Sequence, residues 1–112
     1  MIRRLLGLAP IDHGQIAAGV PRSPQWAKVR AAHLRAHPTC AACGQREKLE
    51  VHHVVPFGVD PSRELDRSNL LTLCSDPCHI VHGHLMSWKR WNAAVVTDVA
   101  IYRTKLEASK RA

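Results

Sequence analysis

Two closely spaced pairs of cysteines constrain the fold of this chain more than any other feature. Two residues separate Cys40 from Cys43, and Cys74 and Cys78 form a second pair further along the chain. A tight turn brings two such sulfurs to one side of the backbone, so two turns together can supply the four thiolates of a tetrahedral zinc site. We therefore expect these four cysteines to hold one structural Zn²⁺.

Two other uses of the cysteines are open from spacing alone, disulfides and a thioredoxin-like redox pair. Disulfides suit small secreted domains, and residues 1–10 resemble a signal peptide only faintly, because Gly7 interrupts the apolar run and Pro10 stops it. The redox interpretation lacks the long helix that should follow Cys43. No apolar run approaches the roughly 18–20 residues that cross a bilayer. We therefore expect a soluble, cytoplasmic protein with no membrane partner, in which paired cysteines favour metal.

Composition indicates an anionic partner. The 112 residues carry 16 Lys and Arg against 9 Asp and Glu, a formal net charge of +7. Such an excess favours binding to nucleic acid, because Lys and Arg side chains that contact phosphates release the counterions condensed on it. The positive charge could also serve solubility alone. With three Trp, one Tyr and one Phe, the chain has few large side chains for a core, and zinc binding would add folding free energy.

Local patterns predict a single α+β domain over residues 23–112, preceded by a loosely ordered arm over residues 1–22. Ser23 and Pro24 form a helix start signal, β-branched runs indicate two short strands, and Asn92 separates the last two helices. The predicted elements are helix Pro24–His37, strand Leu49–Val55, strand Leu70–Leu73, helix His79–Trp91 and helix Ala94–Glu107.

Eight histidines are more than a zinc site of four thiolates requires. His13, His33 and His37 have no metal-like spacing, and we expect them at the surface. His52 and His53 are adjacent in a predicted strand, where neighbouring side chains point to opposite faces. One of them can bind a metal while the other accepts a proton from water, or one can simply pack in the core. The remaining candidates are His79, His82 and His84.

Five short motifs, in this order and spacing, resemble the HNH endonucleases, the zinc-knuckle branch of the ββα-metal nucleases. A further stretch, from His79 to Lys89, resembles one phage and prophage subgroup that reads Cys-His-x-x-x-Gly-His followed by Trp-Lys. The resemblance covers about residues 23–91. The motifs are Cys40-x-x-Cys43, Val51-His52-His53-Val54-Val55-Pro56, Asn69-Leu70, Leu73-Cys74 and Cys78-His79.

The resemblance implies a small ββα-metal core with two cysteine knuckles, flanked by an N-terminal and a C-terminal helix. It assigns His53 as general base and Asn69 as the residue that orients it. The catalytic metal would be held by His52, His79 and a third histidine. His82 lies closer on a regular helix, because five residues turn about 500°. The subgroup pattern points to His84, which we expect to be the ligand if Gly83 loosens the turn.

The implied activity is metal-dependent hydrolysis of DNA phosphodiester bonds, by nicking or by cutting both strands. Three imidazoles suit Zn²⁺, Mn²⁺, Ni²⁺ or Co²⁺ better than Mg²⁺. Mg²⁺ stays among the candidate metals, but many relatives have aspartate in place of His52, so the histidine here counts against it. DNA contacts would be mainly to the backbone, and phage packaging proteins are candidate partners in a host cytoplasm. The candidate phosphate contacts, which could equally be a solvated basic face, are Arg63, Arg67, Lys89 and Arg90.

Two other functions fit the same residues. One is a zinc-knuckle module that binds nucleic acid without cutting it, since a fold does not establish chemistry. The other is a metal sensor or store. Trp88 and Trp91 are three residues apart, so we expect them to pack the predicted helix rather than to stack on bases.

Overall fold

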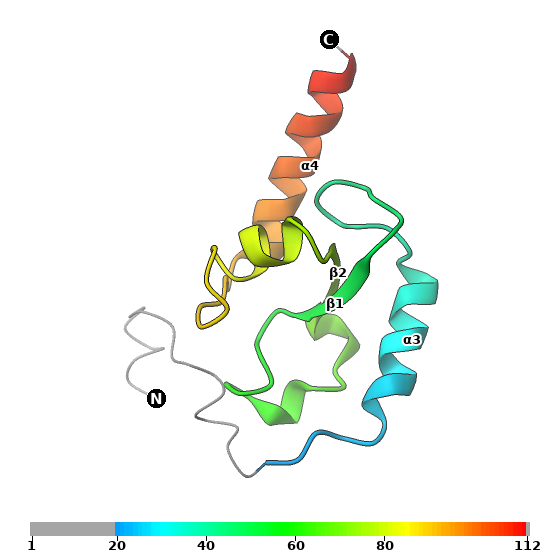
Figure 1. The fold of residues 1–112 in the computed structure, drawn as a ribbon, viewed down its shortest axis with the longest axis vertical. Helices are drawn as coiled ribbons and strands as arrows, with labels where there is room; N and C mark the ends of the chain where they lie inside the picture. Colours follow the sequence, from blue (N-terminus) through cyan, green and yellow to red (C-terminus); the bar gives the residue numbers. More distant parts are fainter. Residues whose placement is uncertain (1–19, 112) are drawn as a thin grey trace.

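The computed structural model describes residues 20–111, and all but the last three residues of the arm predicted over 1–22 lie outside this range (Figure 1). Its main elements are helix α3, two strands that pair antiparallel, and helix α4. In Figure 1, α3 lies on one side of the strands and α4 projects from the other. The predicted α+β class with flanking helices is confirmed. The bounds are α3 Trp26–Ala36, β1 Leu49–His53, β2 Leu70–Cys74 and α4 Val95–Arg111.

Helix α3 begins two residues later than predicted, because Ser23 closes the turn before it. The Ser23 hydroxyl accepts a hydrogen bond from the Gln25 amide at 3.0 Å, and its carbonyl accepts one from the Trp26 amide at 3.2 Å. The helix ends ahead of Pro38, as expected. The prediction that His33 lies at the surface is wrong, since this side chain faces β2 and is only 9% exposed.

The two strands are short and pair in a single register, with Leu49 opposite Cys74 and His53 opposite Leu70. β1 ends at His53, two residues earlier than predicted. Beyond it the backbone is held by one residue, Asn69, whose carbonyl accepts from the Val54 amide at 2.8 Å. The pairing places the end of β1 beside the start of β2.

The predicted helix over His79–Trp91 is wrong in extent. Only His79–Gly83 is helical, as a single π-helical turn. The chain then reverses through Leu85 and Met86, whose φ angles are +53° and +71°, in the left-handed region that few non-glycine residues adopt. The Asn92 amide donates back to the Gly83 carbonyl at 3.0 Å, which closes the reversal. Asn92 is therefore the break that the sequence indicated, at the end of a loop.

The buried core is small and lies around the cysteines. Leu73 from β2 and two valines of α4, Val95 and Val99, pack with them. The knuckle is also tied to α4 by Arg103, whose Nη1 donates to the Cys40 carbonyl at 3.3 Å. Within residues 20–111, no helix combines the length and the apolar character that a membrane crossing requires.

Candidate active site

The first candidate metal site is the group of four cysteines. One pair lies on the turn after α3, and the other pair lies at the end of β2 and just before the π turn. Their sulfurs all lie within 4.8 Å of one another. All four are free thiols, and the 3.9 Å between the sulfurs of Cys43 and Cys74 is too long for a disulfide. The chain thus gathers a donor set suited to tetrahedral zinc.

The protonation of these thiols shows why the cluster favours a cation. Burial raises the pKa of the Cys40 thiol, but backbone hydrogen bonds from Cys43, Cys74 and Ala42 outweigh it and lower the value to about 7. The pKa of Cys78 is raised, first by burial and then by the neighbouring sulfurs. Several thiolates this close repel one another, and a divalent cation among them removes that penalty.

The second candidate site is a group of three histidines, one from β1 and two from the π turn and its end. Ligand atoms of His52, His79 and His84 lie within 4.8 Å of one another. Nε2 of His79 and Nδ1 of His52 lie 3.1 Å apart. His82 is placed elsewhere, with its ring 4.8 Å from that of Tyr102 on α4. Of the two alternatives for the third histidine, the structure brings His84 to the cluster.

The π turn explains how two residues five apart can face the same point. Its hydrogen bonds join residue i to residue i+5, so it turns less per residue than an α-helix and brings positions five apart close together. His79 opens the turn and His84 follows its last residue. Their ring centroids lie 4.9 Å apart. A regular α-helix would have aimed these rings in different directions.

Hydrogen bonds fix the tautomers of two of the three imidazoles. His79 Nδ1 lies 2.8 Å from a carboxylate oxygen of Glu50, and His84 Nδ1 lies 2.7 Å from the Arg90 carbonyl. Both partners only accept, so both Nδ1 atoms carry the proton and both Nε2 atoms keep a lone pair. This is the arrangement of metal-binding histidines, whose second nitrogen typically donates to a carboxylate or carbonyl. The site therefore fits a divalent transition metal.

Sequence analysis missed Glu50. The sequence does indicate its position, because Glu50 lies two residues before His52 in the same strand and so shares a face of the sheet with it. A carboxylate on the metal side of a strand was therefore predictable. The hydrogen bond between Glu50 and His79 was not predictable, because that contact depends on the π turn.

Gly83 allows the π turn to approach His52. A Cβ at Gly83 would lie 2.9 Å from Cε1 of the His52 imidazole, a distance that forces one of them to move. We expect Gly83→Ala to lower the affinity of the histidine site for Mn²⁺ or Ni²⁺ by about 10–100-fold, the usual effect of disturbing a ligand's support. Calorimetric titration measures this affinity. Zinc content should stay at one per chain, and unchanged binding would contradict the close approach.

His53 lies at the end of β1, with its side chain on the opposite face from that of His52. Its ring centroid is 4.5 Å from that of Trp26 on α3. Its Nε2 lies 2.8 Å from the Glu64 carbonyl, which can only accept, so Nε2 carries the proton and Nδ1 keeps its lone pair. Burial lowers the pKa of His53. The neutral imidazole, the form that accepts a proton, is therefore favoured.

The expected contact between Asn69 and His53 is replaced by an indirect one. The buried Asn69 side chain accepts from the Val55 amide at 2.8 Å and donates to the carbonyls of Val55 and Arg63, at 3.0 and 3.3 Å. The residue after Arg63 supplies the carbonyl that holds His53. Asn69 thus closes the loop between the strands, and Glu64, which sequence analysis missed, orients the imidazole.

The Glu64 side chain fixes this loop to the start of α3. Its carboxylate is 4% exposed and accepts from Arg22 Nε at 2.9 Å and from the Ser23 amide at 3.0 Å. The Arg22 guanidinium also lies over the ring of Phe57, at 4.4 Å from its centroid. A buried carboxylate with two donors marks a rigid connection. Glu64, whose carbonyl holds His53, is therefore fixed by its own side chain and by the bond from Asn69 to the preceding residue.

Trp88 does not pack a helix, contrary to the sequence-based expectation. Its side chain is 55% exposed, and its ring lies 5.1 Å from that of His79 and 4.8 Å from that of His84. Lys89 and Arg90 follow it and are also exposed. A largely exposed aromatic ring therefore lies against two of the clustered histidines, and two exposed basic residues follow it in the chain.

A comparison with protein families identifies this segment of the chain. A family model described as HNH endonuclease matches residues 40–85, the segment that carries both pairs of cysteines, both strands, the π turn and all three clustered histidines. No curated protein and no solved structure gave a match.

Proposed function

We propose that this protein, which matches the HNH endonuclease family over residues 40–85, hydrolyses phosphodiester bonds of DNA, because members of that family are generally metal-dependent nucleases. His52, His79 and His84 would hold a single divalent cation, and His53 would act as general base. The convergence of three histidines within 4.8 Å carries this proposal. The catalytic domain would span residues 23–112.

A phosphodiester resists hydrolysis because its negative charge repels nucleophiles and its alkoxide leaves poorly. A divalent cation held by the three histidines would supply Lewis acidity to the crowded phosphate and the departing 3′ oxygen. The chain's part is to hold His79 and His84 in the tautomer that leaves Nε2 with a lone pair, through the Glu50 carboxylate and the Arg90 carbonyl. Mn²⁺, Zn²⁺, Ni²⁺ and Co²⁺ match these nitrogen donors best, and Mg²⁺ matches them least.

Proton transfer is the task of His53. Its Nδ1 lone pair would accept a proton from the attacking water, while the proton on Nε2 stays in the hydrogen bond to the Glu64 carbonyl. The lowered pKa keeps this imidazole neutral in the physiological range. Asn69 would act as a positioning residue, since it braces the loop that carries Glu64.

The four cysteines would hold a structural Zn²⁺ that shapes the site without taking part in chemistry. The sulfur cluster lies next to the histidine cluster in the chain, because Cys78 precedes His79 directly. DNA would bind mainly through its backbone, given the net charge of +7. We place this activity in the cytoplasm of a host cell, with phage packaging proteins as candidate partners.

The test is metal-dependent relaxation of supercoiled plasmid. Protein freed of loosely bound metal should leave the plasmid intact, and adding Mn²⁺ or Ni²⁺ should produce nicked and then linear DNA. Salt-sensitive DNA binding without cleavage under any divalent metal would contradict the proposal and favour a non-catalytic zinc-knuckle module. Tight metal uptake without DNA binding would favour a metal sensor.

A second test addresses Glu50. We expect Glu50→Gln to lower the affinity of the histidine site for Mn²⁺ by about 10–100-fold, because the amide holds the His79 imidazole less firmly than a carboxylate does. Calorimetric titration again measures this. Glu47→Gln is the matched control, since Glu47 is exposed and its carboxylate contacts neither cluster. Equal effects of the two substitutions would show that overall charge, rather than the contact with His79, governs metal binding.

A further inference from the structure

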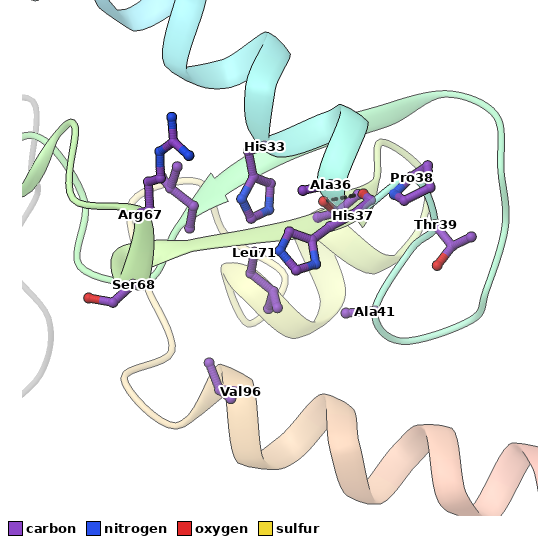
Figure 2. Close-up of a pocket in the computed structure, with 12 residues that line it drawn as sticks. His33, Ala36, His37, Pro38, Thr39, Ala41, Arg67, Ser68, Leu71 and Val96 are labelled. Carbon is purple, nitrogen blue, oxygen red and sulfur yellow. Dashed lines mark hydrogen bonds between the residues drawn. The ribbon is translucent and has the colours of Figure 1, made fainter.

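A cavity of about 470 Å³ lies between the second half of α3 and the edge of β2 that does not face β1 (Figure 2). Figure 2 shows the ring of His33 on α3 beside the ring of His37, the residue after the helix, with both near Leu71 and with Arg67 at one end. None of the residues that line this cavity belongs to the cysteine or histidine clusters. The principal lining residues are His33, His37, Arg67, Ser68, Leu71 and Val96.

His33 supplies a buried polar atom that the rest of the described chain does not satisfy. Its side chain is 9% exposed, and its Nε2 is buried with no hydrogen-bond partner within residues 20–111. The His37 ring lies 4.7 Å from it. Buried polar groups in proteins are nearly always hydrogen-bonded, because an unmade bond is costly. A ligand with an acceptor atom in the cavity would satisfy His33.

The charged side chains around the cavity favour an anionic ligand. Arg67 is exposed and forms no ion pair with any side chain in the described part of the chain, whereas nearby Arg63 is paired with Asp66. The described residues that line the cavity include no acidic side chain. Burial lowers the pKa of His33, and the positive charges of His37 and Arg67 lower it further. The local potential is thus positive, and it repels metal cations while attracting anions.

The hydrogen-bond donors of Ser68 already have a partner within the protein. Its amide and hydroxyl both donate to Asp66 Oδ1, at 3.0 and 2.6 Å. The Thr72 hydroxyl also has a partner, since it donates to the His37 carbonyl at 2.9 Å. The side-chain donors of the lining that remain for a ligand are the Arg67 guanidinium, the two imidazoles and the Thr39 hydroxyl. A guanidinium with additional N–H donors is a common phosphate-binding combination.

We propose that this cavity binds a phosphate group, with Arg67 as the charged contact and His33 Nε2 as the buried donor. Small-molecule sites commonly measure about 300–1,000 Å³, so the attached sugar fits beside the apolar wall formed by Leu71 and Val96. On the proposed function, the phosphate belongs to the DNA backbone at a point away from the cleaved bond. The alternative source of the same group is a small phosphorylated molecule.

Inorganic phosphate tests the site without DNA or cleavage. The zinc-loaded full chain, with no other divalent metal, is titrated with phosphate while the histidine imidazole resonances are followed by NMR. We expect a saturable shift of the His33 signals, and Arg67→Gln should weaken it by about 10–100-fold, the loss of one charged hydrogen bond. Arg35→Gln is the matched control, since Arg35 is an exposed arginine of α3 outside the cavity. No saturable shift, or equal losses in both variants, overturns the proposal.

Thermal unfolding of His33→Leu gives an independent measurement. Removing an unsatisfied buried nitrogen should raise the Tm of the phosphate-free protein, while phosphate should no longer raise it further. A variant that is less stable than the parent and still stabilised by phosphate overturns the role of His33.

Duplex DNA then distinguishes the two sources of phosphate. With His53→Ala protein and no divalent metal, a backbone source predicts that DNA shifts the His33 signals. It also predicts that Arg67→Gln reduces the slope of log K against log salt by about 0.9. A response to phosphate but not to DNA assigns the site to a small phosphorylated molecule. Because the phosphate titration requires no cleavage, an inactive nuclease would leave its outcome unchanged.

Discussion

Replacing His53 with alanine is expected to slow DNA cleavage by about 10²–10⁴-fold, the range that general acid–base catalysis contributes. The imidazole keeps an Nδ1 lone pair while the Glu64 carbonyl fixes its Nε2 proton. Alanine would therefore remove the proposed proton acceptor and leave the proposed metal ligands in place. Single-turnover cleavage of a defined duplex at saturating Mn²⁺ measures the chemical step without product release.

Two controls distinguish loss of the proton acceptor from loss of the fold or of the metal. His82→Ala removes a histidine that contacts Tyr102 and belongs to neither metal cluster, so it should cleave at nearly the parent rate. The His53→Ala protein should keep its zinc content and its affinity for Mn²⁺. A cleavage rate within a few-fold of the parent would show that another group accepts the proton.

Removing the ion from the cysteine cluster is expected to unfold the domain. Structural zinc supplies about 10–16 kcal/mol of apparent binding free energy in zinc-finger peptides, which is comparable to the whole stability of a typical domain, about 5–15 kcal/mol. Here the cysteines are themselves a large part of the buried core. A strong chelator, or Cys74→Ser, should abolish the cooperative thermal transition seen by circular dichroism, and Zn²⁺ should restore it in the chelated protein only.

The comparison with a weak chelator separates the two metal sites. Mild treatment should strip the histidine cluster, which offers three neutral nitrogens rather than four sulfurs, and abolish cleavage while the fold and one zinc per chain persist. Four titratable thiols in the denatured, chelated protein would confirm that the cysteines are unpaired. A chelated protein with an unchanged Tm would contradict a structural role for zinc.

The sequence predicted the parts of the fold that depend on local chemistry. Turn residues, β-branched runs and capping signals placed α3, both strands and α4 within a few residues of their observed bounds. Cysteine spacing also identified a sulfur cluster that the structure assembles. These features rest on interactions within a few residues of the chain, so they can be read without the tertiary structure.

The predictions that were wrong concern segments whose conformation depends on tertiary contacts. The segment after His79 has helical composition, but the close approach of Gly83 to His52 and the return of Asn92 to the Gly83 carbonyl replace the helix with one π turn and a reversal. The partner of His53 is a backbone carbonyl, which every residue has, so no side-chain pattern could identify Glu64. The burial of His33 likewise depends on how α3 lies against β2.

Cys78 and His79 are consecutive residues, and their α-carbons are separated by one trans peptide, about 3.8 Å. The two ion sites are therefore mechanically joined, although neither shares a ligand with the other. Any event that moves the sulfur of Cys78, such as oxidation or loss of its ion, is transmitted to the neighbouring imidazole. On the proposed function, an agent that reacts only with the cysteine cluster would therefore lower activity without contacting the three histidines.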